Sequence, residues 1–297
     1  MAIGRQSSEL RRSLICVPAS NEKMLEKSRT LTADQILFDW EDAVAPAQKE
    51  AARAALTRAL SGASGFKAPI LSVRINALGT PWYGDDIAAL AAIAPRLTSI
   101  VLPKCASASE VGRVAADLAK IAVSKENEIG IDAQVESALG LVNCAEIAAQ
   151  PRVLSLSFGP LDFLADIGVA TTGELDSAAR LIEFALCNVI VGARSAGKLA
   201  FDGPVAEFRN LDKFEASALR SRALGFDGKW VIHPDQLESC NRIYTPTKEE
   251  AAAASELVAR YEAALTKDGA INLGGTMVDE ASFRIAQRTL RRSNAFN

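Results

Sequence analysis

The sequence of 297 residues contains a single histidine, His233, and no pair of cysteines spaced as CxxC. Protein zinc sites are built mainly from histidine and cysteine side chains, so we do not expect this chain to form one. The cysteine count of five is odd, and most of the cysteines lie within apolar or helical patterns. We therefore expect reduced, mostly buried thiols and no disulfide framework.

The sequence also lacks a long apolar run and a strong net charge. No run approaches the roughly 18 apolar residues of a membrane-spanning helix, and LICVP near the N-terminus is too short to act as a signal sequence. With a net charge of −3, the chain has no overall positive field that would attract nucleic acid or an anionic membrane. We expect a cytoplasmic protein that binds neither nucleic acid nor membranes. Any anionic ligand would be bound by positively charged residues near its site.

Eight short apolar runs, most of them followed at once by a charged or polar residue, are separated mainly by stretches long enough for a helix. The predicted strands are 13–17, 35–39, 70–75, 99–103, 131–135, 153–158, 198–202 and 229–232. This alternation is typical of a (β/α)8 TIM barrel, an α/β fold in which parallel strands alternate with outer helices. Hydrophobic residues make up 49% of the chain, enough for a large core. We predict a catalytic barrel over residues 1–245.

Helical patterns fill most of the intervals between these strands. The predicted helices are 21–31, 47–60, 85–94, 110–123, 139–149, 174–196 and 211–223. The stretch GPLDFLADIG, 159–168, is predicted to be a loop because glycine begins and ends it.

Residues 246–297 do not continue the strand–helix alternation. Two helices are predicted, 249–266 and 280–293, with a Gly-rich stretch between them. A barrel does not need this extension, which could form a C-terminal helical lid that closes over its own active site or that of a neighbouring subunit. The alternative is a plain surface hairpin followed by a helix.

Two acidic residues follow the fifth and sixth predicted strands, Glu136 and Asp162. In a barrel the C-terminal ends of the strands meet around one mouth, where active sites lie. Two carboxylates from neighbouring strands form part of an oxygen shell of the kind that Mg²⁺ prefers, with water or substrate in the other positions. The alternative is that each carboxylate caps a helix or forms a surface ion pair.

Charged residues also follow the second, third and fourth predicted strands. Arg74 could hold a substrate carboxylate with two parallel hydrogen bonds, or neutralise the acidic turn that contains Asp39, Glu41 and Asp42. Lys104 could balance Glu136 or stabilise an enolate. A Schiff-base role for Lys104 is disfavoured, because it requires a lowered pKa and acidic neighbours raise the pKa of a lysine.

Three further residues carry less specific signals. His233, after the last predicted strand, is a candidate acid, base or hydrogen-bond donor, although structural histidines are as common. Arg12 and Lys23 are cations near the first predicted strand and are candidate contacts for a phosphorylated ligand or cofactor.

Taken together, these motifs resemble the citrate lyase β-subunit-like branch of the HpcH/HpaI aldolase family, which includes malyl-CoA and citramalyl-CoA lyases. The matching stretches are RRSLICVP, ILFDWEDAVAP, VRIN, IVLPK, QVESALG, FGPLDFLADIG and ALGFDGKWVIHPDQ, and the tail GGTMVDEASFRIAQRTL resembles the lid of the stand-alone lyases. The resemblance covers residues 11 to about 236 and the tail.

The resemblance implies a role for most of the candidate residues. Glu136 and Asp162 would bind Mg²⁺. Arg74 and Glu136 would bind the substrate, with Arg74 holding its carboxylate. Asp279 would be the lid aspartate that enters a neighbouring subunit's site as acid–base. Lys104 and Asp42 are the other catalytic candidates. Family members form trimers or hexamers, so a homo-oligomer, such as a homotrimer, is implied.

The activity implied is a Mg²⁺-dependent carbon–carbon lyase that cleaves or forms a 3-hydroxyacyl-CoA such as malyl-CoA or citramalyl-CoA. One alternative is a malyl-CoA-type thioesterase. Another is a citrate lyase β subunit that acts on citryl-ACP within a complex. Ala19, Trp40 and Ser137 depart from residues common in the family, so the resemblance does not define the acyl group.

Overall fold

The structure is a computed structural model that describes residues 11–62, 65–121, 128–169, 178–264, 271–273 and 276–296. The chain divides into two compact units, residues 1–241 and residues 242–297. The boundary expected from the sequence, after residue 245, lies close to this division. No helix among the described residues is long and apolar enough to cross a membrane.

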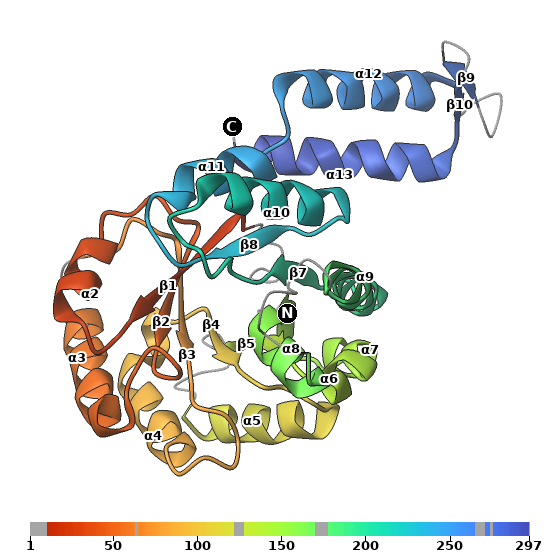
Figure 1. The fold of residues 1–297 in the computed structure, drawn as a ribbon. Coiled ribbons are helices and arrows are strands. Elements are labelled where there is room, and N and C mark those ends of the chain that lie inside the picture. The colour runs from red at the N-terminus through yellow and green to blue at the C-terminus, as the bar shows by residue number, and fades with distance from the viewer. Residues whose placement is uncertain are drawn as a thin grey trace. The chain divides into compact units, whose positions relative to one another are not determined.

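Eight parallel strands form a closed barrel in which each strand pairs with the next and β8 pairs with β1. Outer helices surround the strands (Figure 1). The strands are β1 Ser13–Pro18, β2 Gln35–Asp39, β3 Ile70–Arg74, β4 Ser99–Leu102, β5 Gly130–Val135, β6 Val153–Phe158, β7 Leu199–Asp202 and β8 Gly228–Val231. The predicted (β/α)8 fold is confirmed, and every strand lies within a residue of its predicted limits.

The helices of this unit follow the strands in sequence order. They are α2 Glu22–Ser28, α3 Lys49–Ser61 after the short 3₁₀ helix Pro46–Gln48, α4 Tyr83–Ile93, α5 Ala108–Ile121, α6 Ala138–Val142, α7 Cys144–Ala148, α8 Pro160–Ile167, α9 Ala179–Ser195, α10 Leu211–Ala223 and α11 Gln236–Tyr244, which ends just past the boundary.

The helices of the structure differ from the prediction in three places. Residues 160–167, predicted as a loop, form helix α8, because Pro160 suits the first helical turn and Gly168 ends the helix in the left-handed conformation. The helix predicted over 139–149 is two short helices that meet at Asn143. Helix α11 was not predicted. Part of the helix predicted over 174–196 lies outside the described residues.

The barrel interior contains an apolar cluster and a polar network. Leu14, Leu37, Val101, Leu199, Phe201 and Trp230 form the cluster. The network lies near the N-terminal ends of the strands, where the Asp132 carboxylate accepts hydrogen bonds from Arg11, Ser99 and Ser155 at 2.5–3.2 Å. Arg11 and Asp132 are buried, so their charges are compensated by each other and by these neighbours.

The second unit contains two helices and a small hairpin. Helices α12 Lys248–Ala264 and α13 Glu280–Phe296 pack together, and the rings of Tyr261 and Phe283 stack with centroids 4.9 Å apart. Strands β9 Ile271–Leu273 and β10 Thr276–Val278 are antiparallel. Both predicted helices are present, and the role of this unit as a lid and oligomerisation segment stays a prediction.

Candidate active site

The acidic turn after β2 is organised by the buried carboxylate of Asp39. Its Oδ1 accepts hydrogen bonds from Arg74 Nε at 2.8 Å and from the Glu41 backbone N–H at 2.8 Å. Its Oδ2 accepts them from Arg74 Nη2 at 2.6 Å and from the Ala43 N–H at 3.0 Å. Each oxygen therefore binds one side of the guanidinium and one amide of the turn, which fixes Arg74 relative to Glu41.

Arg74 ends strand β3 and is largely buried. Its Nη1 lies 3.1 Å from Glu41 Oε2, and its guanidinium carbon lies 5.6 Å from the centroid of the Trp230 ring. Burial opposes the charged form, but Asp39 and Glu41 outweigh it and raise the pKa of Arg74. Arg74 thus neutralises the acidic turn, as one of the two alternatives predicted, and this arrangement also orients the fork that a carboxylate clamp requires.

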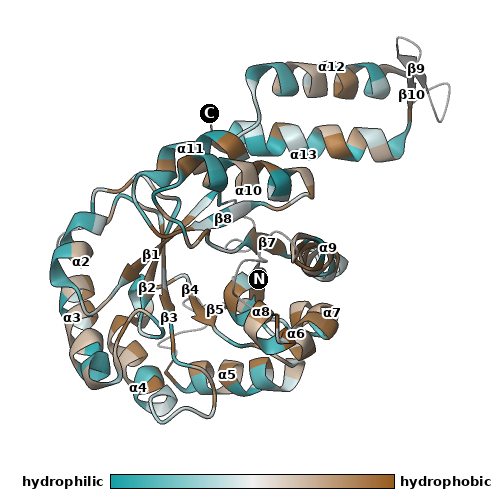
Figure 2. Ribbon diagram, in the orientation of Figure 1, coloured by the Kyte–Doolittle hydropathy of each residue, from teal (hydrophilic) through white to brown (hydrophobic). Residues whose placement is uncertain are grey.

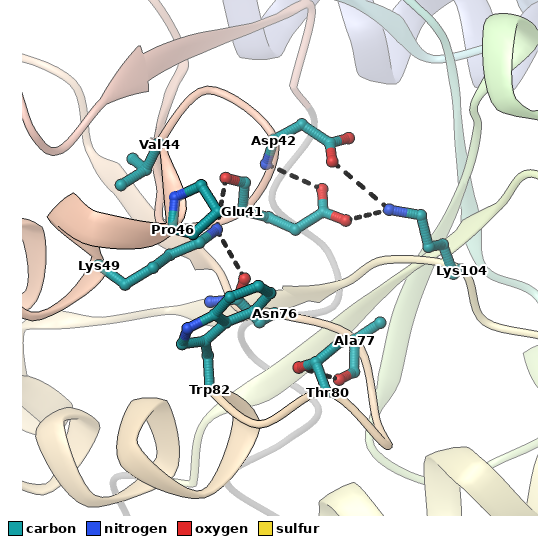
Figure 3. A pocket seen from close by; sticks show the side chains of 10 residues that line it. All are labelled: Glu41, Asp42, Val44, Pro46, Lys49, Asn76, Ala77, Thr80, Trp82 and Lys104. Carbon is teal, nitrogen blue, oxygen red and sulfur yellow. Dashed lines mark hydrogen bonds and ion pairs between the residues drawn. The ribbon is translucent and has the colours of Figure 1, made fainter.

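Lys104 follows β4, and its ammonium group forms ion pairs with Glu41 and, at 3.5 Å, with Asp42 (Figure 3). Burial lowers the pKa of Lys104, but the contacts with Glu41 and Asp42 outweigh it and raise the pKa above its usual value. A lysine that forms a Schiff base needs the opposite shift. Burial raises the pKa of Glu41 despite Arg74 and Lys104, so Glu41 is the less acidic partner of the turn.

The Glu136 carboxylate accepts hydrogen bonds from two neighbours, one after β4 and one in β5. Its Oε1 accepts a hydrogen bond from the backbone N–H of Lys104 at 2.6 Å, and its Oε2 accepts one from Gln134 Nε2 at 2.7 Å. Lys104 has a φ of +51°, the only positive φ at a non-glycine residue in the described part of the chain. This left-handed backbone costs conformational energy and places the N–H against Glu136. Gly159 leaves room for the carboxylate, since a Cβ there would lie 2.6 Å from that of Glu136.

Glu136 and Asp162 form a pair of like charges at the barrel mouth. Burial raises the pKa of Glu136 to about 8, and the negative charge of Asp162 is the next cause. Asp162 lies in the first turn of α8, four residues beyond the end of β6, and not directly at the strand end as the sequence suggested. Its half-buried carboxylate makes no hydrogen bond or ion pair with another described residue.

This pair fits a magnesium ion. A divalent cation relieves the repulsion between two carboxylates, and Mg²⁺ commonly binds one or two of them while it keeps water or substrate oxygens. The described residues contain no group of three or more histidine, cysteine, aspartate or glutamate side chains that could hold a metal. Glu136 and Asp162 would therefore supply the protein ligands, and the remaining positions would stay open for substrate.

The cationic candidates for coenzyme A lie at different ends of the barrel. Lys23 is exposed in the first turn of α2, on the C-terminal side of β1. Arg12 precedes β1, on the opposite side, and its Nε and Nη2 each lie 2.8 Å from an oxygen of Asp34. The structure does not bring Arg12 to the mouth, because it lies at the wrong end of its strand.

His233 and Asp279 have local structural partners. The His233 ring stacks on Phe208 with centroids 5.4 Å apart, and its Nδ1 accepts a hydrogen bond from the Asp235 N–H at 3.3 Å. Asp279 precedes α13 in the second unit, and its Oδ1 accepts hydrogen bonds from the N–H and the hydroxyl of Ser282 at 2.9 and 3.0 Å. These hydrogen bonds hold the pKa of Asp279 below its usual value.

Sequence reasoning missed Lys49, Asn76 and Trp82, which line a cavity of about 260 Å³ beside the acidic turn. Figure 3 shows Lys49, Asn76 and Trp82 on one side of it and Glu41, Asp42 and Lys104 on the other. Lys49 lies in the helix predicted over 47–60, but the sequence analysis gave it no role. The only signal in the sequence was that its helix follows the acidic turn directly.

Comparison with known proteins agrees with this geometry. The family model for HpcH/HpaI aldolase/citrate lyase matches residues 12–234. The chain belongs to this family. It is 34% identical to the L-malyl-CoA/beta-methylmalyl-CoA lyase of Cereibacter sphaeroides, over 93% of this chain and 92% of the relative. It is 35% identical to a (3S)-malyl-CoA thioesterase of the same species, over 96% of this chain and 95% of the relative.

A solved structure is similar over nearly the whole chain. The structure of CitE from Mycobacterium tuberculosis in complex with magnesium, acetoacetate and coenzyme A matches with a TM-score of 0.77 and 30% identity, covering 96% of this chain and 98% of that protein. The family resemblance read from the sequence is thus confirmed, and with it the prediction of an enzyme of the citrate lyase type. The individual residue roles stay predictions.

Proposed function

We propose that this chain is a magnesium-dependent carbon–carbon lyase that cleaves or forms a 3-hydroxyacyl-CoA such as malyl-CoA or citramalyl-CoA. The observation that carries the proposal is the pair Glu136 and Asp162, with Arg74 close enough to Glu136 to lower its pKa. A metal site with open positions next to an oriented guanidinium suits a substrate that carries both a carboxylate and a neighbouring hydroxyl. The similar lyase and the similar structure with magnesium and coenzyme A support the same reaction.

Cleavage requires three events at the substrate. The 3-hydroxyl loses its proton, the bond between C2 and C3 breaks to leave an oxo acid, and the resulting thioester enolate takes up a proton at C2. A bound magnesium ion would polarise the hydroxyl oxygen and the carbonyl that forms from it. Arg74 would hold the substrate carboxylate and so fix the bond that breaks, while Lys104 would place positive charge near the mouth.

Proton transfer is assigned to Asp279. Its lowered pKa keeps the carboxylate ionised at neutral pH, as a base requires. As in the sequence-based prediction, Asp279 would reach the site of a neighbouring subunit when the second unit closes. Asp42, exposed beside Lys104, is the other acidic candidate.

A thioesterase is the second candidate, because a (3S)-malyl-CoA thioesterase is as similar to this chain as the lyase is. The same residues would then direct water to the thioester carbonyl, and the carbon–carbon bond would stay intact. A citrate lyase β subunit that depends on citryl-ACP and partner subunits is a third possibility. The lid-like second unit with Asp279 favours a self-contained enzyme.

One experiment distinguishes these functions. The purified protein is incubated with malyl-CoA or citramalyl-CoA, with Mg²⁺ or with EDTA, and products are identified by mass spectrometry. An oxo acid together with acetyl-CoA supports the lyase, and free CoA with the intact hydroxy acid supports the thioesterase. Activity only on the acyl-carrier substrate within a complex would contradict both.

We further propose that the chain is a cytoplasmic homo-oligomer, a trimer or hexamer. Large apolar side chains are exposed on three neighbouring helices, α6, α8 and α9, and Figure 2 shows the hydrophobic character of α9. The exposed residues are Leu139, Val142, Leu161, Ile167, Phe184 and Val191. Apolar patches of this kind mark interaction surfaces. Light scattering after size exclusion would give the mass, and a monomer would contradict the proposal.

A further inference from the structure

Lys49, at the start of α3, is a buried lysine whose ammonium group donates three hydrogen bonds. It donates hydrogen bonds of 2.7 Å to the backbone carbonyls of Trp40 and Glu41 and to Asn76 Oδ1. The side chain is only 5% exposed, and its nitrogen lies 5.1 Å from the centroid of the Trp82 ring. An ammonium group has three donors, so each N–H of Lys49 has a partner.

Two of these partners belong to the acidic turn that holds the candidate catalytic cations. The amides of Glu41 and Ala43 in this turn donate to Asp39, as described above, and the carbonyls of Trp40 and Glu41 accept from Lys49. The turn is thus held by its N–H groups from one side and by its carbonyl groups from the other. Lys49 is the only side chain with a hydrogen bond to the Glu41 carbonyl among the described residues.

A second layer of buried polar groups fixes the position of Lys49 itself. Asn76 donates to the Trp40 carbonyl at 3.1 Å and to Asp86 Oδ2 at 2.7 Å. Asp86, on α4, also accepts a hydrogen bond from Arg53 at 2.9 Å. Asn76 and Asp86 are buried, so this network connects the turn to helices α3 and α4 in a place where unpaired polar groups would be costly.

Packing does not enclose the whole turn: Trp40 is buried, but the cavity of about 260 Å³ adjoins Glu41 and Asp42. In Figure 3 this cavity lies between Trp82 and Thr80 on one side and Glu41 and Lys104 on the other. A turn beside open space can move when its anchor is lost. A shift of about 1 Å in groups that position a substrate can lower turnover on the order of 100-fold.

We infer that Lys49 is a positioning residue for the reaction: it holds the acidic turn so that Glu41 keeps Arg74 and Lys104 in place at the mouth. The part of this inference that concerns turnover rests on the proposed lyase function. The part that concerns the geometry of Glu41 and Lys104 does not, and it can be measured without any substrate.

The test compares Lys49→Met with a matched control. Methionine keeps the length and apolar stem of the lysine but removes all three donors. The control is Lys120→Met on α5, which removes an exposed lysine whose one ion pair among the described residues is with Asp117. Three quantities are measured for each: turnover of the CoA ester, Mg²⁺ affinity by calorimetry, and the rate at which an amine-specific acylating reagent labels Lys104, read by mass spectrometry.

We expect Lys49→Met to lower kcat by about 10- to 100-fold and to change Mg²⁺ affinity much less, because neither Glu136 nor Asp162 makes a hydrogen bond or ion pair with the turn in the described part of the chain. Labelling of Lys104 should become several-fold faster, because its ammonium group is no longer held in the ion pair with Glu41 and is open to the reagent. Lys120→Met should match the wild type in all three. Wild-type turnover and labelling in Lys49→Met would overturn the inference, as would a proportional loss of turnover and Mg²⁺ affinity, which indicates general loosening.

Asn76→Ala is the second variant if Lys49→Met does not fold. It removes one acceptor of Lys49 and one donor to the Trp40 carbonyl, and we expect a smaller change in the same direction, with faster Lys104 labelling and unchanged Mg²⁺ affinity. Labelling equal to that of the wild type would overturn the inference. If wild-type protein is inactive on all CoA esters, the proposed function fails, but the labelling result still decides the role of Lys49.

Discussion

Replacement of Gly159 by alanine should disturb the magnesium site without touching a ligand. Gly159 precedes α8 with φ −102° and ψ 91°, a conformation that alanine adopts without strain. The new Cβ would lie 2.6 Å from the Cβ of Glu136 and 3.1 Å from Gln134 Nε2, and it would also collide with the Glu136 carboxylate. Contacts this short force Glu136 to move or the strands to separate.

The magnitude follows from these two responses. If the strands separate, the free energy of unfolding falls by about 1–3 kcal/mol, the usual cost of an overpacked site. If Glu136 rotates away, the fold is kept and Mg²⁺ affinity falls by about 10- to 100-fold, as when a neighbour that orients a metal ligand is changed. We expect both responses, because rotation of the side chain removes the collision with the carboxylate, whereas the 2.6 Å contact with the Glu136 Cβ is relieved only by a shift of the backbone.

The assay is Mg²⁺ calorimetry together with denaturant unfolding, and Gly112→Ala is the matched control. Gly112 lies inside α5 with open space around its Cβ position, so alanine there should stabilise the helix by about 0.5–1 kcal/mol and leave Mg²⁺ binding unchanged. Wild-type stability and wild-type Mg²⁺ affinity in Gly159→Ala would refute the assigned packing of Glu136.

Four other outcomes are expected. Because burial and Asp162 raise the pKa of Glu136 to about 8, Mg²⁺ binding below that pH releases a proton, and calorimetry should show affinity rising about tenfold per pH unit up to pH 8. The same shift stabilises the metal-free fold below the ordinary glutamate pKa of 4.5, and that contribution should be lost as pH rises towards 8. Asp132→Ala leaves the buried charge of Arg11 unpaired and should lower the free energy of unfolding by about 3–5 kcal/mol; a loss below about 1 kcal/mol would contradict the network. Asp279→Asn should cut turnover while CoA-ester binding stays nearly unchanged, and lost binding with an unaltered kcat would count against an acid–base role.

The barrel was predictable because its strands are buried on both faces. Such strands appear in the sequence as short apolar runs, and the residue after each run lies at the mouth whatever the loop does next. Glu136, Arg74 and Lys104 were found in this way. Asp162 was identified for the same reason, but its helix α8 was missed because the flanking glycines and Pro160 also suit a loop.

Residues that act from a distance were not predictable from one sequence. Lys49 lies on the same face of α3 as the buried Ala52 and Leu56, where a lysine is not expected, and only the fold shows that its ammonium group binds the acidic turn. Asp132 lies inside an apolar strand, where a charged residue has no sequence signal to indicate its partner Arg11, 121 residues away. Both depend on contacts between distant parts of the chain, which local patterns do not report.

A crystal structure of the protein grown with Mg²⁺ and an oxo acid would show whether Glu136 and Asp162 bind the ion beside Arg74. We predict one ion bound by a carboxylate oxygen of Glu136 and one of Asp162, with the oxo acid in the remaining positions and its carboxylate next to Arg74. An ion bound elsewhere, or an oxo acid that contacts neither the ion nor Arg74, would contradict the account.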